Sequence, residues 1–296
     1  MEAPEPVTRR GPPGRTLREL GPFLEIQNLG LNVSFALAFV FVAAAGLPRL
    51  LPFVLVVVAF VAARNAGHAF NRWADRALDA ANPRTANRAL PAGRLTPRFA
   101  LGVTAASATV LFVAAWLLNP LALALAPVAL LLVLGYSYTK RVSALSTAFL
   151  GLVQAITPAA AFVALQGALP PAALWAVGGV FAWGTAFETV HSLGDLASDR
   201  ELGLRSLPVV LGERNSVRLV AALHVLAVLL LGLFGLAEHL RLPYFLALAV
   251  VLVGVAVTDA RLASAPRAGR PIFERHFLLA AIFLAGVVLA VFVPWG

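Results

Sequence analysis

Long apolar runs separated by short polar segments dominate the pattern along this chain of 296 residues. A membrane-spanning helix needs about 20 mostly apolar residues, and nine stretches of the chain meet that need. Their approximate limits are 23–45, 50–71, 98–117, 120–138, 144–166, 171–191, 216–236, 242–262 and 276–294. The pattern therefore predicts an all-α, polytopic membrane protein with nine transmembrane helices in one bundle.

Composition agrees with a membrane protein. Hydrophobic residues make up 60% of the chain and charged residues 12%, whereas soluble domains average roughly 45–50% and 25%. The chain has no cysteine, which excludes disulfides and thiolate metal sites. Residues 1–20 are rich in Pro, Gly and Arg and predict a disordered, basic cytoplasmic tail rather than a cleaved signal. We expect residues 21–296 to form a single domain.

The distribution of basic residues predicts the orientation in the membrane. The tail and the links after the second, fourth, sixth and eighth predicted helices hold nearly all of the 23 lysine and arginine residues. Such enrichment marks the cytoplasmic side. We therefore expect a multi-pass protein of the inner (plasma) membrane, with its N-terminus in the cytoplasm and its C-terminus outside. The net charge of +9 then reflects topology and an anionic ligand rather than a nucleic acid partner.

Four of the five aspartates form two pairs of equal spacing, Asp75 with Asp79 and Asp195 with Asp199. This spacing places both carboxylates of a pair on one face of a helix, and both pairs fall at predicted cytoplasmic helix ends. Asn71 extends the first stripe by one turn. One such pair alone is often a topology anchor, but two pairs on one side favour a site. Because proteins typically hold Mg²⁺ with one or two carboxylates and substrate phosphates, these five residues predict a Mg²⁺ site for a diphosphate.

Other polar residues lie close to these motifs in the sequence. Tyr136 and Lys140, which is the only lysine, are four residues apart, so both side chains can donate to phosphate oxygens from one helix face. Arg64 lies inside a predicted membrane helix, where a charged residue is by default functional. The remaining candidates for substrate contact are Arg72, Arg84, Arg88 and His191.

The first predicted helix carries a polar stripe of Glu25, Asn28 and Asn32. Polar side chains in a membrane helix face the protein interior. The stripe predicts either a cavity lining, with Asn28 and Asn32 in contact with substrate, or hydrogen bonds between helices.

In combination, the motifs resemble those of the UbiA-type intramembrane prenyltransferases. They are N-R-x-x-D-x-x-x-D from Asn71, P-R-T-A-N-R-A-L-P-A-G from Pro83, Y-x-x-x-K from Tyr136 and D-x-x-x-D-R-x-x-G-x-x-S-L-P from Asp195. The resemblance covers nearly the whole chain and implies a nine-helix fold. It implies that the aspartate motifs bind Mg²⁺ and a prenyl diphosphate, and that Tyr136 and Lys140 contact the diphosphate. Asp75, Asp195, Tyr136 and Lys140 are the residues expected to carry catalysis.

Within that family, residues 82–93, residues 136–141 and the pair Leu223-His224 look most like the 4-hydroxybenzoate branch, which includes enzymes acting on dihydroxynaphthoate. This implies prenyl transfer to an aromatic acid through an allylic cation, in ubiquinone or menaquinone biosynthesis. Other acceptors remain open: a chlorophyllide, haem or a glycerol-phosphate lipid. An ion-coupled transporter is a distant alternative because intramembrane carboxylates also mark ion paths.

Overall fold

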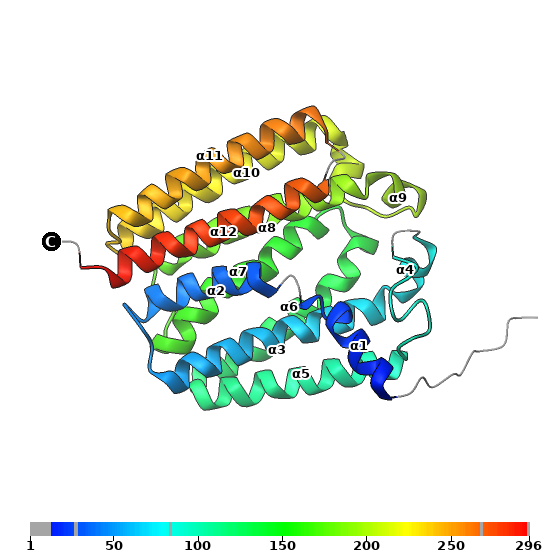
Figure 1. The fold of residues 1–296 in the computed structure, drawn as a ribbon, viewed down its shortest axis with the longest axis horizontal. Coiled ribbons are helices and arrows are strands. Elements are labelled where there is room, and N and C mark those ends of the chain that lie inside the picture. Colours follow the sequence, from blue (N-terminus) through cyan, green and yellow to red (C-terminus); the bar gives the residue numbers. More distant parts are fainter. Residues whose placement is uncertain (1–12, 27–28, 83–84, 267–268, 295–296) are drawn as a thin grey trace, which may run out of the picture.

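The computed structural model describes residues 13–26, 29–82, 85–266 and 269–294, and within these ranges every regular element is a helix. The helices are α1 (Pro13–Phe23), α2 (Leu29–Ala43), α3 (Leu50–Ala74), α4 (Arg76–Ala81), α5 (Pro97–Leu118), α6 (Pro120–Val142), α7 (Ser146–Gln166), α8 (Ala173–Gly194), α9 (Leu196–Glu201), α10 (Leu207–Ala237), α11 (Leu242–Ser264) and α12 (Gly269–Phe292). The long helices run side by side in one bundle (Figure 1). The all-α prediction is therefore confirmed.

Each of the nine predicted apolar stretches overlaps one long helix. In the described residues, seven helices are long and apolar enough to cross a membrane, and they lie within α3, α5, α6, α7, α10, α11 and α12. The described apolar part of α2 is only Val33–Ala43. Helix α8 is not among the seven, but most of its residues are buried, and it packs against α7, α10 and α12. A membrane protein is thus supported, while the count of nine spans stays a prediction.

Large apolar side chains gather both inside the bundle and on its outer face. Phe39 of α2, Phe162 of α7 and Phe234 of α10 are fully buried and belong to one cluster. On the outside, Trp116 and Leu131 are 67% and 71% exposed. Water would oppose such exposure, whereas lipid tails are as apolar as these side chains. The outer surface is therefore suited to a bilayer.

Helices α7 and α8 approach each other closely at two glycines. A Cβ atom added to Gly151 of α7 would lie 2.2 Å from Thr185 Oγ1 and 2.7 Å from the carbonyl oxygen of Phe181. A Cβ added to Gly184 of α8 would lie 3.0 Å from Gly151 Cα. Small residues at helix contacts let membrane helices pack backbone to backbone. This contact sets the distance of α8 from the rest of the bundle.

The N-terminal region differs from the prediction in two ways. Residues 13–20, which were expected to be disordered, belong to α1. The predicted helix over residues 23–45 is interrupted, because α1 ends at Phe23 and α2 begins at Leu29. Glu25 lies in the link with a φ of +49°, so it is not part of a helical stripe. Asn28 and the side chain of Asn32 lie outside the described residues.

Candidate functional site

Both aspartate pairs straddle a break between a long helix and a short one. Asp75 separates α3 from α4 with φ −90° and ψ 5°, and Asp195 separates α8 from α9 with φ −97° and ψ 3°. These angles lie in the sparsely populated bridge region, where many active-site residues occur. In each pair the backbone N–H of the second aspartate donates to the carbonyl of the first at 2.8 Å. The i,i+4 relation therefore survives, although neither pair lies on one continuous helix.

The two motifs lie at the same end of the bundle. Figure 1 shows α4 and α9 together at one end, opposite the C-terminal end of α12. This confirms the predicted convergence of the two pairs at one side of the protein. The side of the membrane that this end faces is a separate prediction.

A single cavity of about 660 Å³ connects the motifs with the apolar interior. Its polar end is lined by Asn71, Asp75, Asp79, Arg88, Tyr136, Glu188, His191, Asp195 and Asp199, and by Arg64 and Arg72. Its apolar part is lined by residues of α2, α3, α5, α6 and α7, such as Val40, Phe60, Leu111, Leu125 and Ile156. Ligand sites typically occupy about 300–1,000 Å³, so the cavity can hold a small molecule with a charged and an apolar part.

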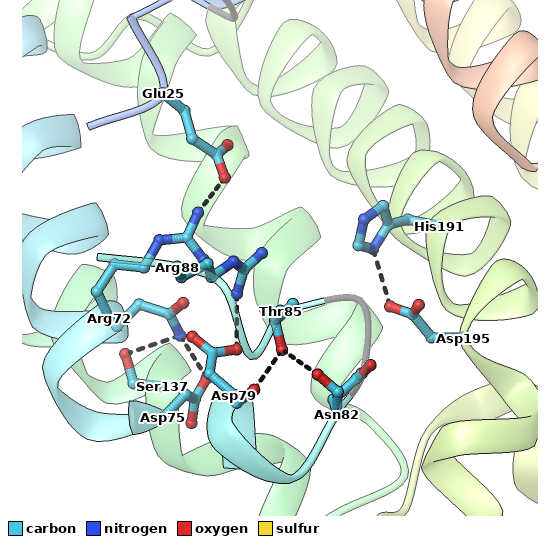
Figure 2. Close-up of polar contacts among 11 residues, drawn as sticks. Glu25, Arg72, Asp75, Asp79, Asn82, Thr85, Arg88, Ser137, His191 and Asp195 are labelled. Carbon is cyan, nitrogen blue, oxygen red and sulfur yellow. Dashed lines mark hydrogen bonds and ion pairs between the residues drawn. The ribbon is translucent and has the colours of Figure 1, made fainter. Parts of the chain in front are cut away.

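The first motif is held by hydrogen bonds from its neighbours (Figure 2). The Asn71 amide donates to Asp75 Oδ2 at 2.9 Å, and Arg88 donates to Asp79 Oδ1 at 2.7 Å. The Thr85 hydroxyl donates to the backbone carbonyl of Asp79 at 2.9 Å, which fixes the turn after α4. The second carboxylate oxygen of Asp79 is buried and has no hydrogen-bond partner among the residues that the structure describes. Such an unsatisfied buried acceptor is rare, and it is suited to bind a cation.

The second motif is linked to two further polar residues of α8 and α6. The Nδ1 atom of His191 lies 4.0 Å from Asp195 Oδ2 and 4.0 Å from Glu188 Oε2. Glu188 is buried, and its Oε1 accepts a hydrogen bond of 3.0 Å from the Tyr136 hydroxyl. Tyr136 and His191 therefore do line the site as predicted. Glu188 was not predicted, although a glutamate inside a membrane helix, two turns before Asp195, is a recognisable signal.

The predicted arginines take different positions around the cavity. Arg72 forms an ion pair with Glu25, and the Arg64 guanidinium donates to the backbone carbonyls of Leu24 and Glu25 at 2.7 and 2.9 Å. These bonds satisfy carbonyls that the break between α1 and α2 leaves without helical partners. Arg64 and Arg72 thus hold the α1–α2 link against the site. Arg84 and the side chain of Lys140 lie outside the described residues.

The four aspartates line one cavity without forming a closed metal cage. Among the residues that the structure describes, no three His, Asp or Glu side chains come together closely enough to hold a metal ion. Figure 2 shows Asp75 and Asp79 on one side of the site and Asp195 on the other, with Thr85 and Asn82 drawn between them. An open set of carboxylates agrees with the way Mg²⁺ is usually bound, through one or two carboxylates, water and substrate phosphates.

A second buried polar cluster lies outside this cavity. The carboxylate oxygen Oδ1 of the fifth aspartate, Asp259 of α11, lies within hydrogen-bond distance of His224 Nδ1 of α10, at 2.9 Å, and His276 Nε2 of α12 lies 3.5 Å from His224 Nε2. Both histidines are at most 1% exposed. The cluster joins three helices through one network. Sequence reasoning did not find it because the three residues are far apart in the chain.

Comparison with known proteins gives a consistent result. Residues 32–282 match the UbiA prenyltransferase family. The chain is 34% identical to a 4-hydroxybenzoate octaprenyltransferase of Aeromonas hydrophila subsp. hydrophila over 203 residues, 69% of this chain and 70% of that protein. It is 31% identical to a 4-hydroxybenzoate octaprenyltransferase of Nitrosomonas europaea over 249 residues, 83% and 85% of the two chains.

Solved structures share the fold. The structure is similar to the apo structure of a UbiA homolog from Aeropyrum pernix K1, with a TM-score of 0.81, 29% identity, and coverage of 89% of this chain and 98% of that one. It is also similar to a UbiA homolog from Archaeoglobus fulgidus bound to DMAPP and Mg²⁺, with a TM-score of 0.74, 17% identity, and coverage of 93% and 100%. The second likeness is one of fold.

Proposed function

Because the chain belongs to the UbiA prenyltransferase family, we propose that it transfers a prenyl group from a prenyl diphosphate to an aromatic acid of the 4-hydroxybenzoate or dihydroxynaphthoate type, in respiratory quinone biosynthesis. One observation carries this proposal: a single cavity has two aspartate motifs at its polar end and an apolar wall along the rest. Relatives with 31% and 34% identity, both named 4-hydroxybenzoate octaprenyltransferase, support the acceptor class.

The residues at the polar end fit a bound Mg²⁺. A buried oxygen of Asp79 has no partner in the described part of the chain, and the donor set consists of oxygen atoms; both features suit a hard cation. The expected ligands are Asn71, Asp75, Asp79, Asp195 and Asp199. When bound, Mg²⁺ would neutralise negative charge on the departing diphosphate.

The cationic residues of the site are suited to bind the diphosphate. Arg88 lies 2.7 Å from Asp79, so its guanidinium stands beside the position that phosphate oxygens would take next to the aspartate motif. Arginine forms forked hydrogen bonds to phosphate, whereas lysine acts as a point charge. We assign diphosphate contacts to Arg72, Arg84 and Arg88, and to Lys140 and Tyr136 at the end of α6.

The apolar part of the cavity has two roles in the reaction. It holds the isoprenoid chain, and it excludes water from the reactive cation. The C1–O bond of the prenyl diphosphate breaks and the diphosphate leaves with the electron pair. The electron-rich ring then attacks C1, and the ring loses a proton. Holding the ring and C1 in contact supplies much of the rate acceleration, and the roles of Arg64, His191, Asn28 and Asn32 are to position these groups.

The topology belongs to the same proposal. Nine spans, with the N-terminus and the aspartate end in the cytoplasm and the C-terminus outside, follow from the positions of the basic residues. The site then faces the cytoplasm, where charged diphosphate and aromatic acid are soluble. Residues 21–296 form one catalytic domain of the inner membrane.

The test is an acceptor competition with purified protein in detergent. A labelled prenyl diphosphate and Mg²⁺ are supplied with 4-hydroxybenzoate, a dihydroxynaphthoate, a chlorophyllide and a glycerol-phosphate lipid, and products are identified by mass. We expect prenylation of an aromatic acid and loss of turnover in excess EDTA. Product from only the chlorophyllide or the glycerol lipid would refute the acceptor assignment, and full turnover in EDTA would refute the metal assignment.

A further inference from the structure

Glu188 is a buried acidic residue of the cavity to which metal and diphosphate binding assign no role. It is 5% exposed, lines the cavity and accepts the Tyr136 hydroxyl at 3.0 Å. It precedes Asp195 by seven residues on α8, which is about two helical turns and places both residues on one face. An acidic side chain in a membrane helix is costly and is by default functional.

Glu188 precedes Asp195, the residue that ends α8, by about two helical turns, so it lies further from the aspartate end of the bundle along that helix. His191 Nδ1 lies 4.0 Å from Glu188 Oε2 and 4.0 Å from Asp195 Oδ2. The two carboxylate oxygens can therefore be no further apart than twice that distance. A diphosphate held at Asp195 places its C1 atom on the inner side of the motif, towards the apolar wall. The acceptor ring, which must contact C1, then lies within reach of Glu188.

The other carboxylates and the arginines of the cavity are poor candidates to accept a proton there. His68 and His191 also line the cavity, and because both keep their side chains in the Glu188 variants, the test below separates them from Glu188. The carboxylates among the described lining residues are Glu188, Glu25 and the four motif aspartates. The aspartates are the proposed metal ligands, and Glu25 is paired with Arg72. The arginines cannot accept a proton, because guanidinium stays protonated in proteins.

We propose that Glu188 is the base that removes the ring proton in the reaction proposed above, and this inference rests on that reaction. Once the ring carbon has bonded to C1, the C–H bond at the same carbon breaks. Its electron pair restores the aromatic ring, and the proton passes to a carboxylate oxygen of Glu188. The hydrogen bond from Tyr136 fixes the orientation of the carboxylate during this step.

The variant Glu188→Gln separates this role from a merely structural one. Glutamine keeps an oxygen that can accept the Tyr136 hydrogen bond but cannot take a proton at neutral pH. Its matched control is Glu238→Gln, the same change at an acidic residue that does not line the cavity. Turnover is measured with 4-hydroxybenzoate carrying hydrogen or deuterium at the ring carbons beside the hydroxyl-bearing carbon. The rate with the hydrogen-bearing acceptor is divided by the rate with the deuterated acceptor, and both are measured on the same protein preparation. This ratio does not depend on the fraction of folded protein.

We expect Glu188→Gln to lower kcat by about 10²-fold or more, the usual contribution of a positioned base, with the KM for prenyl diphosphate nearly unchanged. Proton removal then limits the rate, so this variant shows a primary deuterium isotope effect that the wild type and Glu238→Gln lack. Glu188→Asp recovers part of the rate, and it replaces Glu188→Gln in the isotope measurement if the latter has no measurable turnover. Absence of an isotope effect in the variant measured would overturn the proposal. If the proposed function itself is wrong, the wild-type protein forms no prenylated aromatic product, which is a different outcome from the absence of an isotope effect in the variant.

Discussion

Replacement of Gly151 by alanine tests whether the close contact between α7 and α8 positions the second aspartate motif. The added Cβ would lie 2.2 Å from Thr185 Oγ1, 2.7 Å from the Phe181 carbonyl oxygen and 2.9 Å from the Thr185 backbone nitrogen. Two of these three atoms belong to the backbone of α8, so rotation of one side chain cannot relieve the clash. The helices must separate, and α8 carries Glu188, His191 and Asp195 with it.

The expected cost follows from two opposing effects. Forcing one extra carbon into a packed contact costs about 1–3 kcal/mol, whereas alanine stabilises a helix relative to glycine by roughly 0.5–1 kcal/mol. Gly102 of α5 is a matched control, because it is exposed and an added Cβ there meets nothing within 4 Å. Gly102→Ala should therefore be stabilised by the higher helix propensity of alanine, with no cost from a steric clash.

The assay is apparent Tm in detergent at one scan rate, followed by kcat at saturating substrates. One kcal/mol corresponds to roughly 2–4 °C for a chain of about this size. We expect Gly151→Ala to melt below Gly102→Ala by several degrees and to lose turnover, while Gly102→Ala keeps wild-type turnover. Equal or higher Tm for Gly151→Ala, together with normal kcat, would show that the contact does not set the position of α8.

Two further substitutions probe residues with opposite roles. Asp259→Asn should lower the free energy of unfolding by about 1–3 kcal/mol, because it weakens the buried hydrogen bond to His224. The rate per folded molecule should stay near that of the wild type. A normal Tm, or a loss of kcat without a loss of stability, would contradict a structural role for Asp259. Lys140→Ala should raise the KM for prenyl diphosphate. Lys140→Arg should recover only part of the affinity, because the planar guanidinium of arginine replaces the compact charge of the lysine ammonium. An unchanged KM in Lys140→Ala would show that this residue only anchors the end of α6.

The sequence alone was sufficient to predict the helical class and the convergence of the motifs. Apolar runs of about 20 residues leave few alternatives to a helix in a bilayer, and the basic links placed Asp75 and Asp195 at one end of the bundle before the structure did. The position of the helix breaks at these two residues could not be predicted. Two aspartates spaced i,i+4 predict one continuous helix, and only the backbone angles of Asp75 and Asp195 reveal that the helix is interrupted there.

The contacts of the polar residues were the least predictable part. Glu25 was expected in a helical stripe, but it lies in a link that is held by Arg64 and Arg72. Local hydrophobicity carries no information about such a link, because its partners are 39, 40 and 47 residues away in the chain. Glu188 shows the same limit: its bond with Tyr136 joins α6 to α8, and no spacing rule within one helix can reveal a contact between two helices.

The most direct test of the central claim compares turnover in Asp75→Asn, Asp195→Asn and the double variant. Asparagine keeps the size of each side chain but removes a negative charge from one motif on either side of the cavity. If both motifs hold one diphosphate and its metal, each single variant loses nearly all activity and the double variant is scarcely worse, because residues that act as a unit are not additive. Retention of more than about a tenth of the wild-type rate in both single variants, a barrier change below about 1.4 kcal/mol, would contradict the account.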